Sequence, residues 1–142
     1  MEEAMKTIEH PQVKILAIND EADVLVQISN TLSGAGYSCR CARDAQSAGE
    51  AVREAMPDLI ISDVNLAGHS GLTLCEQLKQ RADIGDVPVM FLSAAQVPDI
   101  IRRSHTAGGT YYLRKPFDAE VLLQLIEQVL LPQLTGSQLA HI

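Results

Sequence analysis

The strongest constraint on this chain is an alternation, repeated five times, of short apolar segments with longer stretches of helical periodicity. Apolar segments this short and continuous are typical of strands covered on both faces, which indicates a parallel sheet. Right-handed crossovers then predict an α/β fold: a doubly wound, five-stranded parallel sheet in the flavodoxin-like order 2-1-3-4-5, with helices on both faces. The expected strands are 13–18, 37–42, 59–61, 87–92 and 111–113.

Helix-start and helix-stop signals separate these strands. Asp44 and Asp118 are expected N-caps, and Pro98 fits the first turn of a helix that ends near Gly108. The segment 68–71, Gly-His-Ser-Gly, is expected to be a loop before the third helix. The apolar side of that helix is expected to be Leu72, Leu74, Cys75 and Leu78.

Length and composition fit one globular domain. The chain has 142 residues, of which 46% are apolar and only 4% aromatic, so the core must be aliphatic. We predict one domain over residues 12–131, an N-terminal tail at 1–11, and a C-terminal tail or start of a linker at 132–142.

Charge and cysteine usage exclude several classes of protein. A net charge of -7 argues against direct nucleic-acid binding, because phosphate backbones are neutralised by clustered Lys and Arg. No apolar run approaches the roughly 18 residues of a membrane span, and the acidic start does not resemble a secretory leader. An odd number of cysteines, three, favours a reducing compartment. These features predict a cytoplasmic protein without a membrane partner.

Polar residues stand at the carboxyl ends of the predicted strands. Asp20 follows the first strand, Asp63 the third, Ser93 the fourth and Lys115 the fifth. In the predicted topology Asp20 and Asp63 converge, and two close carboxylates repel unless a cation lies between them. Carboxylate oxygens with open water positions suit Mg²⁺, and a hydroxyl and an ammonium can bind a transferred phosphoryl group.

Taken in order, these segments resemble the receiver domain of two-component response regulators, in its chemotaxis-regulator-like form. The resemblance covers residues 12–131 and rests on four motifs, each at the end of the expected strand. They are Ile15–Glu21, Pro57–Asp63 with Gly68 and Gly71, Phe91–Ala94, and Ala107–Phe117.

The resemblance implies a role for each motif residue. Asp63 would be the phosphoryl acceptor, with Mg²⁺ held by the Asp20 and Asp63 carboxylates and the Asn65 main-chain carbonyl. Ser93 would hydrogen-bond the phosphoryl group and shift on phosphorylation, Lys115 would pair with a phosphoryl oxygen, and Tyr112 matches the aromatic switch position.

Two positions depart from the family pattern. Asn19 replaces the first acid of the usual pair, which predicts weaker Mg²⁺ binding rather than its loss; the alternative is a receiver that no longer uses phosphate. Ala67 stands where the family usually has Pro, and without a fixed φ this loop is expected to be more mobile.

Structural explanations stand beside the functional ones. Asp63 could be a helix cap or a solvent-facing residue, and Tyr112 a packing residue. Cys39 and Cys41 share a face of the second strand, but no second pair completes a metal site, so small core or edge residues are expected. His69 is expected to be a solvated loop residue near the site.

The leading functional hypothesis is a signalling switch that assists its own phosphorylation and dephosphorylation without acting as an enzyme on an external substrate. The expected phosphodonor is a sensor histidine kinase or a histidine phosphotransfer protein, and the output an unknown effector or a fused output domain. The expected output face combines helix 98–107, strand 111–113 and the last helix. A homodimer through Ile100, Ile101, Arg102 and Arg103 stays open.

Two alternatives come from other classes. A pseudo-receiver would serve as a protein-interaction module independent of phosphorylation. A small phosphohydrolase would need a second acid two residues after its nucleophile, where this chain has Asn65.

Overall fold

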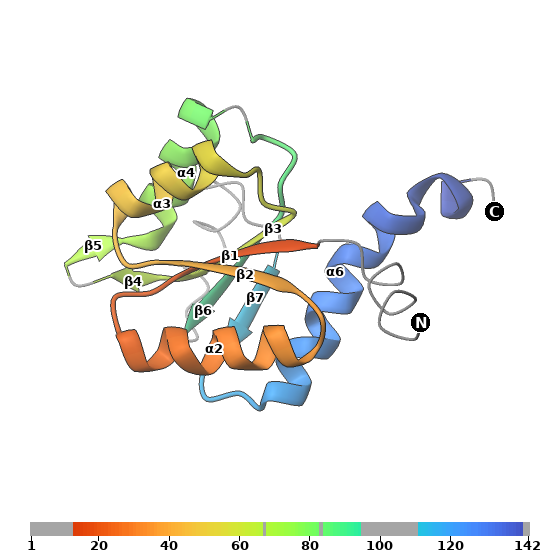
Figure 1. The fold of residues 1–142 in the computed structure, drawn as a ribbon, viewed down its shortest axis with the longest axis horizontal. Coiled ribbons are helices and arrows are strands. Elements are labelled where there is room, and N and C mark those ends of the chain that lie inside the picture. Colours follow the sequence, from red (N-terminus) through yellow and green to blue (C-terminus); the bar gives the residue numbers. More distant parts are fainter. Residues whose placement is uncertain (1–12, 67, 83, 95–110, 141–142) are drawn as a thin grey trace, which may run out of the picture.

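The computed structural model describes residues 13–66, 68–82, 84–94 and 111–140, which form one parallel sheet covered by helices (Figure 1). The five sheet strands are β1 (Lys14–Ile18), β2 (Ser38–Ala42), β3 (Leu59–Asp63), β6 (Val89–Ser93) and β7 (Tyr111–Arg114). Their order is β2-β1-β3-β6-β7, and every neighbouring pair is parallel. This confirms the predicted doubly wound sheet and its strand order.

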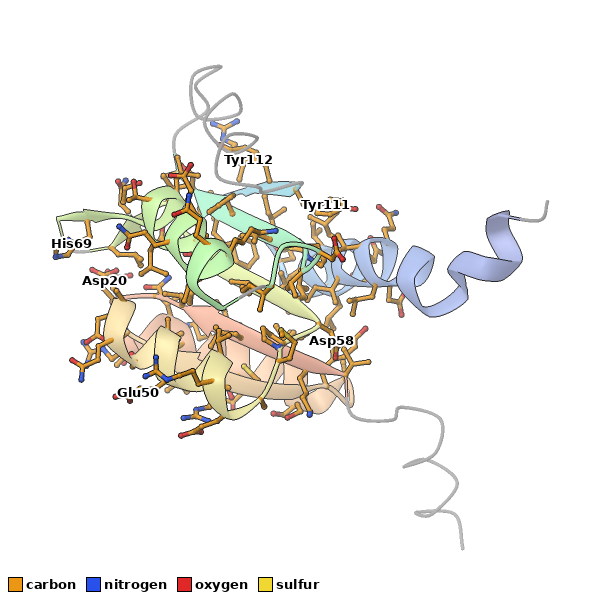
Figure 2. All side chains as sticks on the ribbon, turned by 90° about the horizontal axis from the view of Figure 1, so that it is seen from above. Asp20, Glu50, Asp58, His69, Tyr111 and Tyr112 are labelled. Carbon is orange, nitrogen blue, oxygen red and sulfur yellow. The ribbon has the colours of Figure 1, made fainter. Side chains whose placement is uncertain are left out.

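In the described part of the chain, four helices cover the two faces of the sheet. Helices α3 (Ala45–Glu54) and α4 (Gly71–Ala82) lie on one face, and α2 (Ala22–Gly34) and α6 (Ala119–Ala140) on the other (Figure 1). The parallel strands all run toward the end of the sheet where Asp20 and His69 lie, opposite the end that carries Asp58 (Figure 2).

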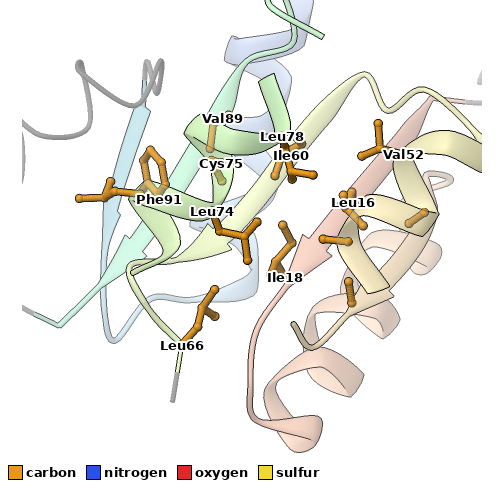
Figure 3. Packing of buried hydrophobic residues seen from close by; sticks show 14 of the residues in the cluster. Leu16, Ile18, Val52, Ile60, Leu66, Leu74, Cys75, Leu78, Val89 and Phe91 are labelled. Atoms are coloured by element: carbon orange, nitrogen blue, oxygen red, sulfur yellow. The ribbon is translucent and has the colours of Figure 1, made fainter. Parts of the chain in front are cut away.

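The alternation of side chains along each strand divides the core into two layers. On β1, Leu16 and Ile18 pack with the α3 and α4 side chains, whereas Ile15 and Ala17 pack with those of α2 and α6. Figure 3 shows the first layer, with Ile60 of β3 at its centre. All four apolar residues predicted for α4 are buried: Leu72, Leu74, Cys75 and Leu78.

The start of α3 follows the predicted capping chemistry. The Asp44 carboxylate accepts a hydrogen bond from the Ser47 amide at 2.8 Å, and the Ser47 hydroxyl contacts the Asp44 backbone, which forms a capping box. The hydrogen bonds that the Ser47 amide and hydroxyl donate to the Asp44 carboxylate hold the pKa of this carboxyl below its usual value. The cap fixes where the chain turns after β2.

The prediction of a loop at 68–71 is wrong in detail. Asn65–Leu66 (β4) and His69–Ser70 (β5) form a short antiparallel hairpin, and Gly71 already belongs to α4. Gly68 has a positive φ of 89°, which a residue without Cβ adopts at little cost and which lets the chain reverse. Leu66 is buried in the core layer of α3 and α4, and this anchors the hairpin.

Several predictions fall on other parts of the chain. Ala67, helix 98–107 with Ile100–Arg103, and the tail at 1–11 lie outside the described residues. Helix α6 continues to Ala140, past residue 131, so residues 132–140 are helical; the predicted domain boundary itself stays a prediction. Within the described ranges, no helix combines the length and apolar character that crossing a membrane requires.

The centre of the core gives a first test. Replacing Ile60 with alanine removes a fully buried side chain from β3, and the cavity should lower the free energy of unfolding by about 2–5 kcal/mol. Val26→Ala on α2 is the matched control, because Val26 is 56% exposed and its truncation should change stability by less than about 0.5 kcal/mol. Urea unfolding measures both; equal effects of the two variants would contradict this packing.

Thiol reactivity gives a second test. Burial raises the pKa of the Cys75 thiol to about 12, so almost no thiolate is present near neutral pH, whereas Cys41 is exposed. Iodoacetamide should therefore label Cys41 quickly and Cys75 only in denaturant, as measured by peptide mass spectrometry. The Cys41→Ser variant should lose the fast label. Fast modification of Cys75 in the native protein would show that α4 is not packed as described.

Candidate functional site

The carboxyl ends of the central strands place four polar residues at one edge of the sheet. Asn19 follows β1 directly, Asp63 is the last residue of β3, and Ser93 is the last residue of β6. Lys115 follows β7 directly. Because all of these strands are parallel, their ends meet at the same edge, as the sequence pattern predicts.

The Asp63 carboxylate is held from three directions. The Lys115 ammonium donates to Asp63 Oδ2 at 2.5 Å, and the Asn19 amide donates to the same oxygen at 3.3 Å. The Asn65 backbone N–H donates to Asp63 Oδ1 at 3.2 Å. The Asp63 side chain is only 10% exposed, and these donors compensate a charge that would otherwise be costly to remove from water.

The backbone of β6 fixes the position of Lys115. The Lys115 backbone N–H donates to the Ser93 carbonyl at 2.9 Å. This hydrogen bond extends the pairing of β6 and β7 one residue beyond the paired residues Ser93 and Arg114. The Lys115–Pro116 peptide bond is cis. Ser93 is itself buried and is the last residue of β6, at the same edge of the sheet as Asp63 and Lys115.

Asn19 is fully buried and has a fixed orientation. Its backbone N–H donates to the Ala42 carbonyl at 3.1 Å, and its side-chain Oδ1 accepts from the Glu21 N–H at 2.9 Å. The second contact supplies an acceptor at the start of α2, where the N-cap residue Glu21 makes no side-chain capping hydrogen bond. With Oδ1 used in this way, the amide nitrogen faces Asp63.

Asp20 is half-buried beside Asn19, at the end of the sheet where His69 is exposed (Figure 2). The Arg43 guanidinium donates to the Asp20 carbonyl at 2.9 Å and ties this segment to the turn before α3. The sequence pattern does not indicate Arg43, because nothing in its neighbourhood distinguishes it from a solvated surface arginine.

Gly71 packs against the backbone of Asp63. A Cβ built at Gly71 would overlap the Asp63 carbonyl oxygen and lie 3.0 Å from the Ser62 hydroxyl oxygen. The Gly71 N–H also donates to the Val64 carbonyl at 2.7 Å. The sequence shows Gly71 as part of a motif, but its steric role becomes visible only when α4 is placed against the end of β3.

Comparison with known proteins identifies the family. The family model described as the response regulator receiver domain matches residues 15–127. The chain belongs to this receiver family. Receiver domains of two-component response regulators are phosphorylatable signalling switches rather than classical enzymes, and they generally bind Mg²⁺ at the acidic pocket.

Individual relatives agree with this membership. The chain is 34% identical over 116 residues to the phosphate regulon transcriptional regulatory protein PhoB of Pseudomonas aeruginosa, covering 82% of this chain and 51% of the relative. It is 35% identical over 118 residues to the response regulator MprA of Mycobacterium leprae, covering 83% of this chain and 51% of that protein. The chain thus spans about half the length of these two relatives.

A solved structure of a chemotaxis protein shows the same fold. The chain superimposes on CheY4 of Vibrio cholerae with a TM-score of 0.79 and 30% sequence identity, covering 83% of this chain and 98% of that one. The family resemblance and the fold predicted from the sequence are therefore both confirmed.

The predicted metal ligands of this receiver domain form a small donor set. Among the described residues, no three His, Cys, Asp or Glu side chains gather as a metal site. The predicted ligands are two carboxylates, from Asp20 and Asp63, and the main-chain carbonyl of Asn65. These hard oxygen donors fit Mg²⁺, which keeps several of its waters in such sites.

Tyr112 lies on β7 in register with Phe91 of β6 and is half-buried. Its position three residues before Lys115 matches the predicted switch position, whereas a switching role stays a prediction. The same holds for the roles of Ser93 and Lys115 toward a phosphoryl group.

The close approach of Gly71 gives a third test. Gly71→Ala should move α4 or Asp63 and lower the free energy of unfolding by about 1–3 kcal/mol, as overpacking typically does. Gly49→Ala within α3 is the matched control: its new Cβ would meet only Arg53 Nη1 at 3.9 Å, and alanine favours the helix, so it should stabilise slightly. Urea unfolding compares them, and a neutral Gly71→Ala would contradict the described packing of α4 on β3.

Proposed function

We propose that this receiver domain accepts a phosphoryl group on Asp63 from a phosphohistidine of a sensor histidine kinase or histidine phosphotransfer protein. The observation that carries the proposal is the Asp63 carboxylate itself, at the end of the central strand β3 and bound by the Lys115 ammonium at 2.5 Å. A carboxylate held by a lysine at the edge of a parallel sheet has a fixed position and an adjacent cation, which are what phosphoryl transfer requires.

The chemistry follows from these groups. An Asp63 carboxylate oxygen forms a bond to phosphorus while the P–N bond of the phosphohistidine breaks. The imidazole nitrogen keeps the electron pair of that bond and takes a proton from solvent when needed. Lys115 offsets charge on the phosphoryl oxygens, and the Ser93 hydroxyl donates a hydrogen bond to them.

Magnesium is the proposed cofactor of this step. Asp20, Asp63 and the Asn65 carbonyl would hold it, and when bound it would neutralise part of the charge on the phosphoryl oxygens. With Asn19 in place of an acid, the two carboxylates and the Lys115 ammonium leave one net negative charge at the site. We therefore expect Mg²⁺ to bind more weakly than at a site with a third carboxylate.

Phosphorylation is proposed to change the output face through Ser93 and Tyr112. Tyr112 lies on β7, next to the strand β6 that ends in Ser93. The proposed face combines β7, α6 and the helix predicted at 98–107, which lies outside the described residues. A rearrangement there would shift the population that binds an effector or a fused output domain. The chain would also assist hydrolysis of its own aspartyl phosphate and would act in the cytoplasm.

Intact-protein mass spectrometry after incubation with acetyl phosphate tests the acceptor. Asp63 displaces acetate, which leaves with the electron pair of the broken P–O bond, so the protein should gain one phosphoryl group in the presence of Mg²⁺. Asp63→Ala should not gain it. Asp86→Ala is the matched control, because Asp86 is exposed in the loop before β6 and should leave the gain unchanged.

Two outcomes would overturn the proposal. A gain that persists in Asp63→Ala would place the acceptor elsewhere. No gain in the wild-type protein, even at high Mg²⁺, would favour the phosphorylation-independent interaction module.

A further inference from the structure

In the hydrogen bond between Asn19 and Asp63, Asn19 is the donor, a role that an ionised acid at position 19 could not take. The Asn19 nitrogen donates to Asp63 Oδ2 at 3.3 Å, beside the Lys115 ammonium on the same oxygen. An ionised carboxylate has only acceptor oxygens, so an aspartate at position 19 would turn this attraction into a repulsion.

The orientation of the Asn19 amide follows from its second contact. Oδ1 accepts the Glu21 N–H at 2.9 Å, and an N–H donor can be satisfied only by the oxygen end of the amide. The nitrogen end must then point to Asp63. Because Asn19 is fully buried, water does not offer either end an alternative partner.

The charge of the site explains why a donor at position 19 matters in the absence of a cation. Asp63 is nearly buried, and Asp20 adds a second carboxylate at the same edge of the sheet. A third carboxylate at position 19 would raise the charge that the Lys115 ammonium leaves uncompensated from one negative charge to two, and Asp63 would then depend on a bound cation to stay in place. It would also repel an incoming phosphoryl group, which is itself negatively charged.

We propose that Asn19 is a positioning residue that does part of what a bound cation would do. It holds the Asp63 carboxylate in position without metal and so makes phosphorylation less dependent on Mg²⁺. The part that concerns phosphorylation rests on the function proposed above. The part that concerns the metal-free site does not.

Asn19→Asp isolates this role from a purely structural one. Aspartate has nearly the same shape, and its Oδ1 can still accept the Glu21 N–H, so the contact at the start of α2 is retained. Only the donation to Asp63 is lost, and one negative charge is gained. Asn30→Asp is the matched control, because it makes the same chemical change at an exposed position on α2.

Thermal unfolding tests the metal-free site without any phosphorylation. In a chelator, Asn19→Asp should unfold at a lower temperature than both the wild-type protein and Asn30→Asp. Addition of Mg²⁺ should raise its unfolding temperature much more than theirs, because a ligand that binds only the folded state stabilises that state more the tighter it binds. If Asn19→Asp behaves like Asn30→Asp in both conditions, the proposal is overturned.

Phosphorylation rates with acetyl phosphate test the second part. The ratio of the rate in saturating Mg²⁺ to the rate in chelator should be about tenfold or more larger in Asn19→Asp than in the wild-type protein, the effect of one hydrogen bond to a charged group. Asn19→Ala removes the donor without adding charge, so its rate in chelator should fall below the wild-type rate. Equal ratios in wild type and Asn19→Asp, or an unchanged chelator rate in Asn19→Ala, would refute the role of Asn19.

Failure of the two proposals would look different. If Asp63 is never phosphorylated, the proposed function fails, and the thermal measurements still decide whether Asn19 holds the metal-free site. If Asp63 is phosphorylated but the Mg²⁺ dependence is the same in the wild-type protein and in Asn19→Asp, the function stands and the role of Asn19 is rejected.

Discussion

The structure depends most on the need to compensate one nearly buried carboxylate, that of Asp63. Its ion partner, Lys115, is not on a neighbouring strand, because β6 lies between β3 and β7. The pair therefore forms only when β6 is in register with both neighbours, with Asp63 opposite Leu92 and Ser93 opposite Arg114. A one-residue slip of a strand would turn its side chains to the opposite face and separate the charges. The strand register that packs the apolar side chains therefore also sets the geometry of the site.

The backbone side of Asp63 is constrained by sterics rather than by charge. Gly71 begins α4 in direct contact with the Asp63 carbonyl, and the hairpin of β4 and β5 brings the chain from one to the other. Buried Leu66 anchors that hairpin in the core. Asp63 is thus fixed through its side chain by donors and through its main chain by a helix that has no room for a side chain at its first residue.

The sequence contains those parts of this arrangement that follow from pattern. Apolar runs such as 59–61 indicate buried parallel strands, and parallel strands bring Asp63, Ser93 and Lys115 to one edge. Asp44 is predictable as a cap from local chemistry alone. The hairpin of β4 and β5 is not, because two-residue strands have no periodicity to detect. The roles of Gly71 and Arg43 depend on how segments pack: Gly71 on the hairpin that returns the chain to Asp63, and Arg43 on Asp20, 23 residues earlier in the chain. A sequence pattern does not show such packing.

For Asn19, the sequence motif gives the position of the residue in the site but not the hydrogen bonds that it makes. As a departure from an acidic pair it suggests only a loss, of one negative charge and of part of the affinity for Mg²⁺. The structure adds the direction of the hydrogen bond: Glu21 uses the oxygen, so the nitrogen serves Asp63. One substitution of oxygen by nitrogen then changes the sign of a contact inside the site. With the role proposed for Asn19, a receiver with this residue would bind a cation more weakly and, through the same atom, would need one less, so the substitution does not by itself mean that the site has been abandoned.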